Sequence, residues 1–201
     1  MPIKIGSTGI GAIYKGSTPI IKIYKGTDLL FQKVEEEANL LKLLIEGTIE
    51  KVTADDLGSI ATIGEYSFEE CSLLEEISLP TTVTTIGTYA FYGCTNLSKI
   101  ELNEGLTTIG TYAFYGCENI KDITFPSTLT SIGTYAFSSS DGKSSFQIDT
   151  LTCLAVTPPT IESNASYSLP SATKIYVPID SLSAYQSATK WSVYANRMEG
   201  I

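Results

Sequence analysis

The chain has 201 residues, of which 43% are hydrophobic and 17% charged, so it can bury a core as one ordinary domain or two small ones, and its composition excludes a disordered chain or a coiled coil. It contains no histidine, which removes the commonest general base and the zinc and nucleophile motifs that need one. Thirteen Lys and Arg against 22 Asp and Glu give a net charge of −9. We expect no nucleic-acid partner, because such a chain repels a phosphate backbone.

No stretch of the sequence approaches the roughly 20 apolar residues of a membrane span, so we expect no membrane insertion. The first residues, MPIKIGSTGIG, lack the apolar run and the small-residue cleavage site of a secretory signal. The sequence therefore predicts a soluble chain that is not exported by that route.

Residues 1–34 repeat at a step of ten: IGSTGIGAIY from Ile5, KGSTPIIKIY from Lys15 and KGTDLLFQKV from Lys25. Gly-Ser/Thr turns alternate with apolar runs such as 20–24, which predicts a small antiparallel β meander. This arm holds five Lys and one Asp, a charge of +4, whereas residues 35–201 carry −13. The charge boundary indicates a separate module.

Residues 35–61 come between this arm and the main repeats. VEEEANLLKLLIEG is compatible with a short helix or a first strand, and TIEKVTADDLGSI is similar to a degenerate repeat. We interpret the segment as an N-terminal cap, because an open coil would expose the apolar spine and a sheet edge.

A longer repeat fills the middle of the chain. TIGEYSFEECSLLEEISL begins at Thr62, TIGTYAFYGCTNLSKIEL at Thr85 and TIGTYAFYGCENIKDITF at Thr108, and a fourth copy opens as SIGTYAF at Ser131. The step is 23 residues each time, inside the range of about 20 to 29 residues of leucine-rich repeats and well below that of ankyrin or tetratricopeptide units. The pattern predicts a solenoid.

Within each copy the apolar residues follow the spacing Leu74-x-x-Ile77-x-Leu79, and the last two positions alternate as in a strand. Stacked copies should pair these strands into a parallel sheet and place like residues above one another in a continuous apolar spine. The return segment is Ile-Gly-x-x-Ala-Phe. Its repeated Gly, such as Gly64 and Gly87, is expected to allow a turn that residues with a Cβ cannot make.

These residues resemble a known family. The frame C-x-x-(L/I)-x-x-I-x-(L/F), followed after three residues by (V/L)-x-x-I-G-x-x-(A/S)-F, is similar to the BspA-type leucine-rich repeat, which is common in proteins of gut and oral bacteria and their phages. The resemblance spans Leu57 to Thr157. The common leucine-rich repeat has Asn or Cys where this chain has Thr82 or Gly105, so no Asn ladder is expected.

The fourth copy carries an insertion of about five residues within SSSDGKSS, after which the frame resumes as Ile148-x-x-Leu151-x-Cys153. Insertions in repeats map to loops on one face. The insertion is either a simple surface loop or a binding loop.

Cys71, Cys94 and Cys117 recur at one repeat position. Equivalent Cβ atoms near 4.8 Å apart are too distant for a disulfide, and a straight column without histidine offers no four-ligand zinc geometry. We therefore expect a column of buried thiols. The chain is expected to hold no metal and no cofactor.

A column of tyrosines is the first candidate surface. Half-exposed rings could stack on sugars or anchor a partner protein, or they could only cover the convex surface. The column comprises Tyr66, Tyr89, Tyr112 and Tyr135, flanked by Tyr92 and Tyr115.

The outward face of the strands is the second candidate. The concave sheet face is the usual binding site of leucine-rich repeats, so the resemblance implies the same here, although these side chains include no aromatic anchor and are compatible with a merely solvated face. The candidate residues are Glu76, Ser78, Lys99, Glu101, Asp122 and Thr124.

The last segment follows Pro158-Pro159. A strand through 174–177 and a helix from Asp180 or Ser181, with apolar residues at helix-like spacing, are predicted. The segment resembles the terminal cap of BspA-type arrays, and we expect the single Trp, Trp191, to plug the last coil.

The sequence thus predicts an α/β solenoid, mostly β, with an N-terminal antiparallel β arm (1–34) and a capped repeat domain (35–201), divided into an N-cap (35–61), repeats (62–157) and a C-cap (158–201). We expect a non-catalytic structural or binding protein whose partner is a protein or a surface glycan. No constellation of perturbed titratable groups suggests an enzyme.

Two settings remain open for this function. Residues 1–34 resemble the N-terminal arms of virion proteins from phages of gut bacteria, which favours a phage particle in which the arm contacts other virion proteins, packs on the solenoid, or associates with itself in a homo-oligomer. The alternative is a bacterial cell-surface adhesin module.

Overall fold

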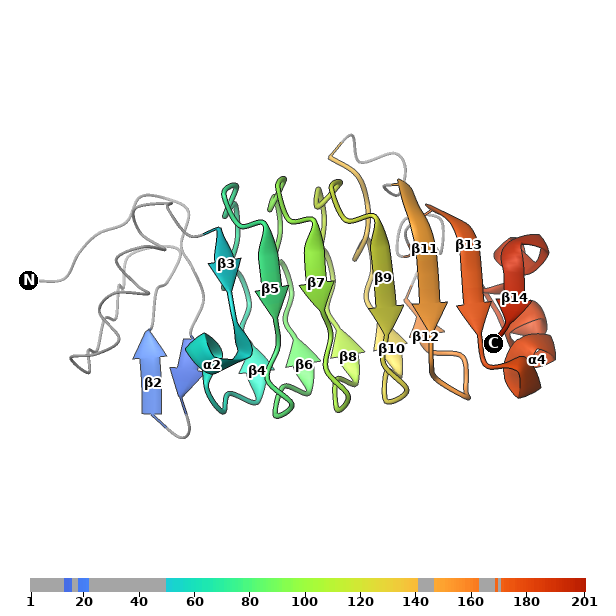
Figure 1. Ribbon diagram of the computed structural model, residues 1–201, viewed down its shortest axis with the longest axis horizontal. Helices are drawn as coiled ribbons and strands as arrows, with labels where there is room; N and C mark the ends of the chain where they lie inside the picture. Colours follow the sequence, from blue (N-terminus) through green and yellow to red (C-terminus); the bar gives the residue numbers. More distant parts are fainter. Residues whose placement is uncertain (1–12, 16–17, 22–49, 141–146, 163–168, 170) are drawn as a thin grey trace, which may run out of the picture.

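The computed structural model describes residues 13–15, 18–21, 50–140, 147–162, 169 and 171–201. The solenoid elements up to the inserted loop are β3 (Lys51–Val52), α2 (Ala54–Leu57), β4 (Thr62–Ile63), β5 (Glu76–Ser78), β6 (Thr85–Ile86), β7 (Lys99–Glu101), β8 (Thr108–Ile109), β9 (Asp122–Phe125) and β10 (Ser131–Ile132). Beyond it lie β11 (Gln147–Cys153), β12 (Thr160–Ile161), β13 (Ser171–Val177), η1 (Ile179–Ser181), α4 (Leu182–Ser187), η2 (Ser192–Arg197) and β14 (Met198–Gly200). The coils stack side by side along one axis (Figure 1).

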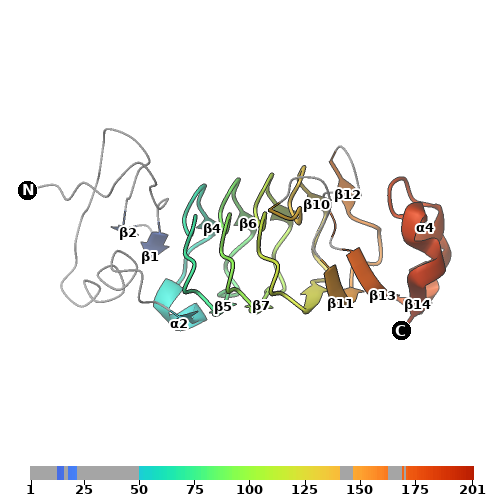
Figure 2. The ribbon, with the colours of Figure 1, turned by 90° about the horizontal axis from the view of Figure 1, so that it is seen from above.

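Two sides of each coil carry parallel strands (Figure 2). One side holds the five-stranded sheet β12-β10-β8-β6-β4, and the other holds a three-stranded sheet, β3-β5-β7, followed by a four-stranded sheet, β14-β13-β11-β9. The parallel solenoid predicted from the repeats is confirmed. The second side differs from the single sheet that we expected, because β7 and β9 share no paired residues among those that the structure describes.

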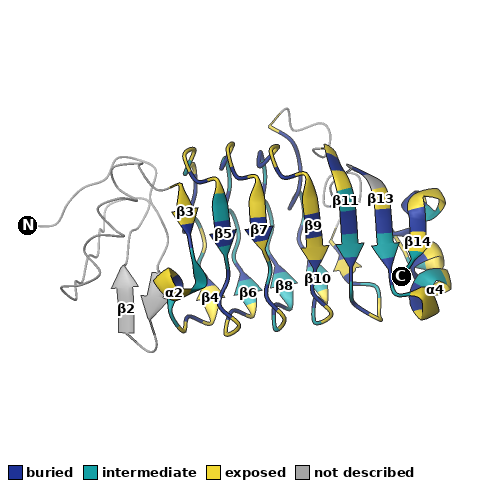
Figure 3. Ribbon diagram, in the orientation of Figure 1, coloured by how far each residue is buried: buried dark blue, intermediate teal, exposed yellow. Residues whose placement is uncertain are grey.

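The register agrees with the repeat alignment. Ile77 pairs with Ile100 between β5 and β7, and Leu151 pairs with Ile123 between β11 and β9. Burial alternates along β5, β7 and β9, with the Ile side chains inward (Figure 3). Since Cys153 lies opposite Phe125, the frame does resume after the insertion, as predicted.

The return segment also begins with a strand, which the sequence analysis assigned only to a turn. The two-residue strands β4, β6, β8 and β10 place Ile63, Ile86, Ile109 and Ile132 in one in-register row, which Ile161 of β12 extends. A two-residue strand is too short for its alternation to be visible in a sequence.

The turns that follow are linked between coils as well. The amide of Phe68 donates to Ala90 O at 2.7 Å, that of Phe91 to Ala113 O at 2.8 Å, and that of Phe114 to Ala136 O at 2.8 Å. Backbone hydrogen bonds therefore join neighbouring coils on three sides, which satisfies polar groups that a buried irregular turn would leave unpaired.

The core is one continuous apolar column. Its members include Phe68, Phe91, Phe114 and Phe137, each 0% exposed, whose rings stack at centroid distances of 5.0–5.1 Å and within 13° of parallel. The spacing of the coils thus sets the spacing of the rings, and each coil buries its apolar side only because a neighbour covers it.

The repeated Gly of the return segment has a different cause from the one predicted. Gly87, Gly110 and Gly133 are absent from the positive-φ positions of the chain, so no unusual backbone angle requires them. A Cβ on Gly110 would instead lie 2.7 Å from Gly87 C and 2.8 Å from Thr88 N. Glycine is needed because the backbones of successive coils touch at this point.

Threonine replaces the Asn ladder of the common repeat. Thr82 Oγ1 donates to Ile60 O at 2.6 Å, and Thr128 Oγ1 donates to Leu106 O at 2.8 Å. In the intervening copy, where the position is Gly105, Asn103 Nδ2 reaches the equivalent carbonyl, Val83 O, at 2.8 Å. The carbonyl of the preceding coil is satisfied in all three copies.

Two strands of the N-terminal arm lie within the described residues. β1 (Ile13–Lys15) and β2 (Thr18–Ile21) pair antiparallel, as predicted for the arm. The other predicted arm segments, the sequence VEEEANLLKLLIEG and the core of the insertion (141–146) lie outside the described residues. The parallel ladder begins at β3, inside the segment that we interpreted as the N-terminal cap.

The C-terminal segment closes the last coil with side-chain donors. Tyr185 Oη donates to Ala155 O at 2.7 Å, Trp191 Nε1 to Pro159 O at 2.8 Å, and Lys190 Nζ to Ile161 O. Trp191 is 1% exposed and packs edge-on against Tyr185. The plug role expected for Trp191 is confirmed, and the predicted helix is divided into α4 and η2.

We predict that Gly110→Ala lowers the free energy of unfolding by about 1–3 kcal/mol, because the added methyl must push two backbones apart. Chemical denaturation measures the effect. Thr95→Ala, at an exposed turn position of the preceding repeat, is the control and should change stability by about 0.5 kcal/mol or less. Equal stability of the two variants would contradict the close approach of the coils.

Tyr185→Phe is expected to lower the free energy of unfolding by about 1–3 kcal/mol, because it leaves Ala155 O buried without a donor while preserving the ring. The matched control is Tyr176→Phe on the half-buried outer face of β13, which should cost about 0.5 kcal/mol or less. A thermal or urea melt that does not separate the two variants would contradict the capping role of the hydroxyl.

Candidate functional site

The outer face of β3, β5, β7 and β9 carries side chains in straight rows, because the strands are in register. Lys51 lies beside Glu76, and Glu76 beside Lys99. Asp122 occupies the same repeat position in β9. The row therefore alternates in sign from coil to coil, and the surface is locally neutral even though the chain is acidic.

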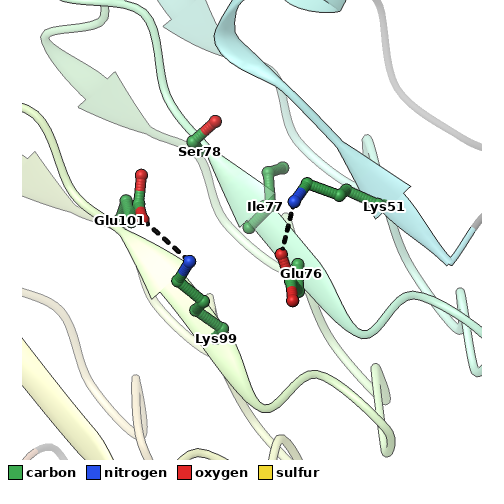
Figure 4. Close-up of a pocket in the computed structure, with 6 residues that line it drawn as sticks. All are labelled: Lys51, Glu76, Ile77, Ser78, Lys99 and Glu101. Carbon is green, nitrogen blue, oxygen red and sulfur yellow. Dashed lines mark ion pairs between the residues drawn. The ribbon is translucent and has the colours of Figure 1, made fainter.

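Two ion pairs fix the charged side chains of this face (Figure 4). Lys51 Nζ lies 2.7 Å from Glu76 Oε2, and Lys99 Nζ lies 3.0 Å from Glu101 Oε1. The hydrogen bond and charge of Lys51 lower the pKa of Glu76, with a smaller contribution from Lys99. Glu101, and then Glu76, raise the pKa of Lys99. Glu76 and Lys99 thus stay charged near neutral pH.

These side chains surround a shallow depression of about 40 Å³, which is lined by Lys51, Glu76, Ile77, Ser78, Lys99 and Glu101. That volume is enough for about one water molecule and far below the roughly 300 Å³ of a small-molecule pocket. The face can contact the surface of a macromolecule, but this depression does not enclose a substrate.

The structure brings four of the six predicted surface residues together, namely Glu76, Ser78, Lys99 and Glu101. Ser78 is partly committed to the fold, because its hydroxyl accepts a hydrogen bond from Ala54 N at 3.1 Å. Asp122 and Thr124 are exposed on β9 and lie outside the depression, beyond the break in the sheet.

Sequence analysis missed Lys51. It belongs to the row because β3 pairs with β5 and sets Lys51 opposite Glu76. The distance from Lys51 to Glu76 is 25 residues instead of 23, so the strand falls out of step with the repeat. The apolar residue Val52, which aligns with Ile77, is the signal that could have revealed it.

The predicted tyrosine column is continuous. Rings of Tyr66, Tyr89, Tyr112 and Tyr135 stack at centroid distances of 4.9–5.1 Å, and a second column pairs Tyr92 with Tyr115 at 4.9 Å. Both faces of Tyr89 and of Tyr112 are covered by their neighbours. A sugar that stacks on a ring face therefore finds no uncovered face on these two residues.

All four tyrosines of the first column hold a left-handed backbone, with φ between 55° and 58°. A residue with a Cβ pays an energetic penalty there that glycine does not. The half-buried rings compensate, since aromatic pairs contribute about 0.5–1.5 kcal/mol beyond the area they bury. The strained turn and the stack therefore occur together in every copy.

All four cysteines are free thiols. Cys94 Sγ donates to Phe68 O at 2.9 Å, and Cys117 Sγ donates to Phe91 O at 3.0 Å. Burial, followed by the neighbouring Cys94, raises the pKa of Cys71 to about 12. A thiol held in its protonated form is a poor nucleophile. Cys94 and Cys117 are buried as predicted, whereas Cys71 is only partly buried, and the three thiols pack as part of the core.

The described part of the chain has no cluster of metal ligands and no membrane-spanning helix. No group of three or more Cys, Asp or Glu in it is placed to hold a metal ion. Within the same residues no helix has the length and apolar character to cross a membrane.

Comparison with known families identifies the repeats. The family model described as "BspA type Leucine rich repeat region (6 copies)" matches residues 46–154, more than half of the chain. No curated protein matches the chain.

Two solved structures are similar to the chain. The crystal structure of a T. pallidum leucine rich repeat protein is 28% identical with a TM-score of 0.53, over 65% of this chain and 59% of that one. A leucine-rich repeat protein from Bacteroides ovatus is 20% identical with a TM-score of 0.33, over 60% of this chain and 43% of that one. The chain spans less than two thirds of either protein.

Substitution of Tyr112 should distinguish the energetic cost of the left-handed backbone from the loss of the ring contacts. Both Tyr112→Gly and Tyr112→Ala lose the ring contacts, but we expect the Ala variant to be less stable by about 1 kcal/mol, because Ala is strained at a φ of 55°. Urea denaturation measures the difference. At Thr134, which lacks a positive φ, the order should be the usual one, with Ala more stable than Gly. The same order at both positions would contradict the left-handed turn.

Proposed function

Since the chain belongs to the BspA-type leucine-rich repeat family, we propose that it is a non-catalytic binding protein whose recognition surface is the outer face of β5, β7 and β9. The candidate surface comprises Glu76, Ser78, Lys99, Glu101, Asp122 and Thr124. The observation that carries the proposal is the in-register row of paired charges, which a rigid ladder of strands holds at fixed positions.

Charge pairing on this surface favours a macromolecular partner with polar contacts of both signs. Alternating Lys and carboxylate groups specify orientation and partner choice more than raw affinity, and a depression of about 40 Å³ leaves the contact spread over an open face. A protein or a surface glycan fits this description better than a small metabolite does.

The setting that we propose is a phage particle, in which the solenoid acts as a fibre, decoration or host-attachment component and residues 1–34 contact other virion proteins. The opposite charges of the arm (+4) and the remainder (−13) support two modules with different partners. A bacterial cell-surface adhesin module is the second candidate, and the similarity to a T. pallidum leucine rich repeat protein favours a bacterial setting.

Mass spectrometry of purified phage particles separates the two settings. We expect peptides of this chain in the particles, and we expect their stoichiometry to stay the same through washing and density-gradient purification. Detection only on the surface of uninfected bacteria would instead support the adhesin and exclude the virion role.

Recognition by the sheet face can be tested with charge swaps. Lys99→Glu combined with Glu101→Lys keeps the net charge and the ion pair but reverses the pattern, so binding to any surface protein or glycan that the wild type retains on an array should weaken by about tenfold or more.

The matched control is Lys174→Glu with Glu199→Lys, which reverses an ion pair (3.4 Å) at the far end of the row. It should leave binding unchanged. Equal binding by the first swap and the wild type, with both folded by circular dichroism, would exclude this face as the recognition surface.

A further inference from the structure

The tyrosine columns form the middle of a second surface, on the turn side of the coils, which we call the tyrosine face. Every member is half-buried. The members are Tyr66, Thr88, Tyr89, Tyr92, Thr111, Tyr112, Tyr115, Thr134 and Tyr135.

This face carries no charge over three successive coils. The equivalent positions are charged only in the first coil, where Glu65 occupies the place of Thr88 and Glu69 the place of Tyr92. In a chain with a net charge of −9, an uncharged stretch of this length is a local exception. Depletion of charge together with enrichment of tyrosine is the composition found at the centres of protein interfaces.

The stacked rings also make the face rigid before any partner arrives. Ring planes of Tyr89 and Tyr112 lie within 5° of parallel at 4.9 Å, and Tyr92 and Tyr115 tilt against them at 5.4 Å and 5.5 Å. Rings already fixed by neighbours lose little further entropy on binding. Because the ring faces are stacked on one another, a partner meets the ring edges, which suits contact with another protein surface.

From these observations we propose that the tyrosine face is a symmetric dimer interface, occupied by a second copy of this chain. A second copy presents the same 4.9–5.1 Å repeat, so contacts made at one coil recur at the next without slipping out of step. Two chains with a net charge of −9 repel each other overall, and a face without charged side chains over three coils adds no local repulsion to their contact.

Charge at the end of the face selects the antiparallel arrangement. Glu65 and Glu70 are exposed in the first coil, while the fourth coil has Thr134 and Ser139 at the corresponding repeat positions. A parallel pair would set carboxylates against carboxylates. A two-fold axis that lies in the plane of the interface, at right angles to the solenoid axis, sets them against the hydroxyl-bearing coil of the other copy, and two-fold symmetry is that of most homodimers.

The test is the oligomeric state of the full chain and of two matched double variants. Thr88→Asp with Thr111→Asp places two charges in neighbouring coils on the tyrosine face. Thr150→Asp with Thr152→Asp places two charges on β11, on the other side of the coil and outside the candidate recognition surface. Sedimentation equilibrium gives the dissociation constants, and circular dichroism and thermal melts show that both variants are folded.

We expect a dimeric wild type, a dissociation constant at least about tenfold higher for the tyrosine-face variant because it buries unpaired charges, and wild-type dimerisation for the control. A monomeric wild type at all accessible concentrations overturns the proposal. So does a dimer that the tyrosine-face variant retains, which would point to residues 1–34, or one that both variants lose equally. None of these outcomes bears on partner binding by the sheet face, which the Lys99 and Glu101 swap tests separately.

Discussion

Hydrogen bonding between consecutive coils, held to one repeat length, is the constraint on which the rest of the molecule depends. Backbone amides and carbonyls of neighbouring coils pair with one another on three sides of the stack, so any residue type that recurs every 23 positions becomes a column. Phenylalanines and thiols fill the interior as columns, and tyrosines and charges line the exterior in the same way. No single coil has a core of its own.

The same constraint decides which positions tolerate change. Gly110 is fixed because a Cβ there would lie 2.7 Å from the carbonyl carbon of Gly87, and Tyr112 is fixed by a ring stack that offsets a left-handed turn. At the two ends of the stack, backbone groups need other hydrogen-bond partners, because a neighbouring coil lies on one side only. At the C-terminal end, the side chains of Tyr185, Lys190 and Trp191 donate to backbone carbonyls that the amides of another coil would otherwise occupy.

Columns also organise the surface into faces with different chemistry. On the sheet face, alternating Lys and carboxylate side chains pair with one another, as Lys51 does with Glu76. On the tyrosine face the same periodicity yields an uncharged, preorganised strip. A chain with a net charge of −9 thus presents two surfaces without a large net field, and both are suited to contacts that depend on shape and orientation.

Recurrence at a fixed step is a one-dimensional signal, so the repeat, the solenoid class, the inward positions of Ile77 and its equivalents, and the resumption of the frame after the insertion could all be predicted from the order of residues. Which atoms of neighbouring coils meet became visible only in the folded chain. That the repeated glycine is needed for close approach, that tyrosine takes the left-handed turn, that Lys51 joins the charged row, and that the sheet breaks between β7 and β9 all depend on distances across coils. Such distances have no counterpart in residue spacing along one chain, where the relevant partners lie 22–25 positions away.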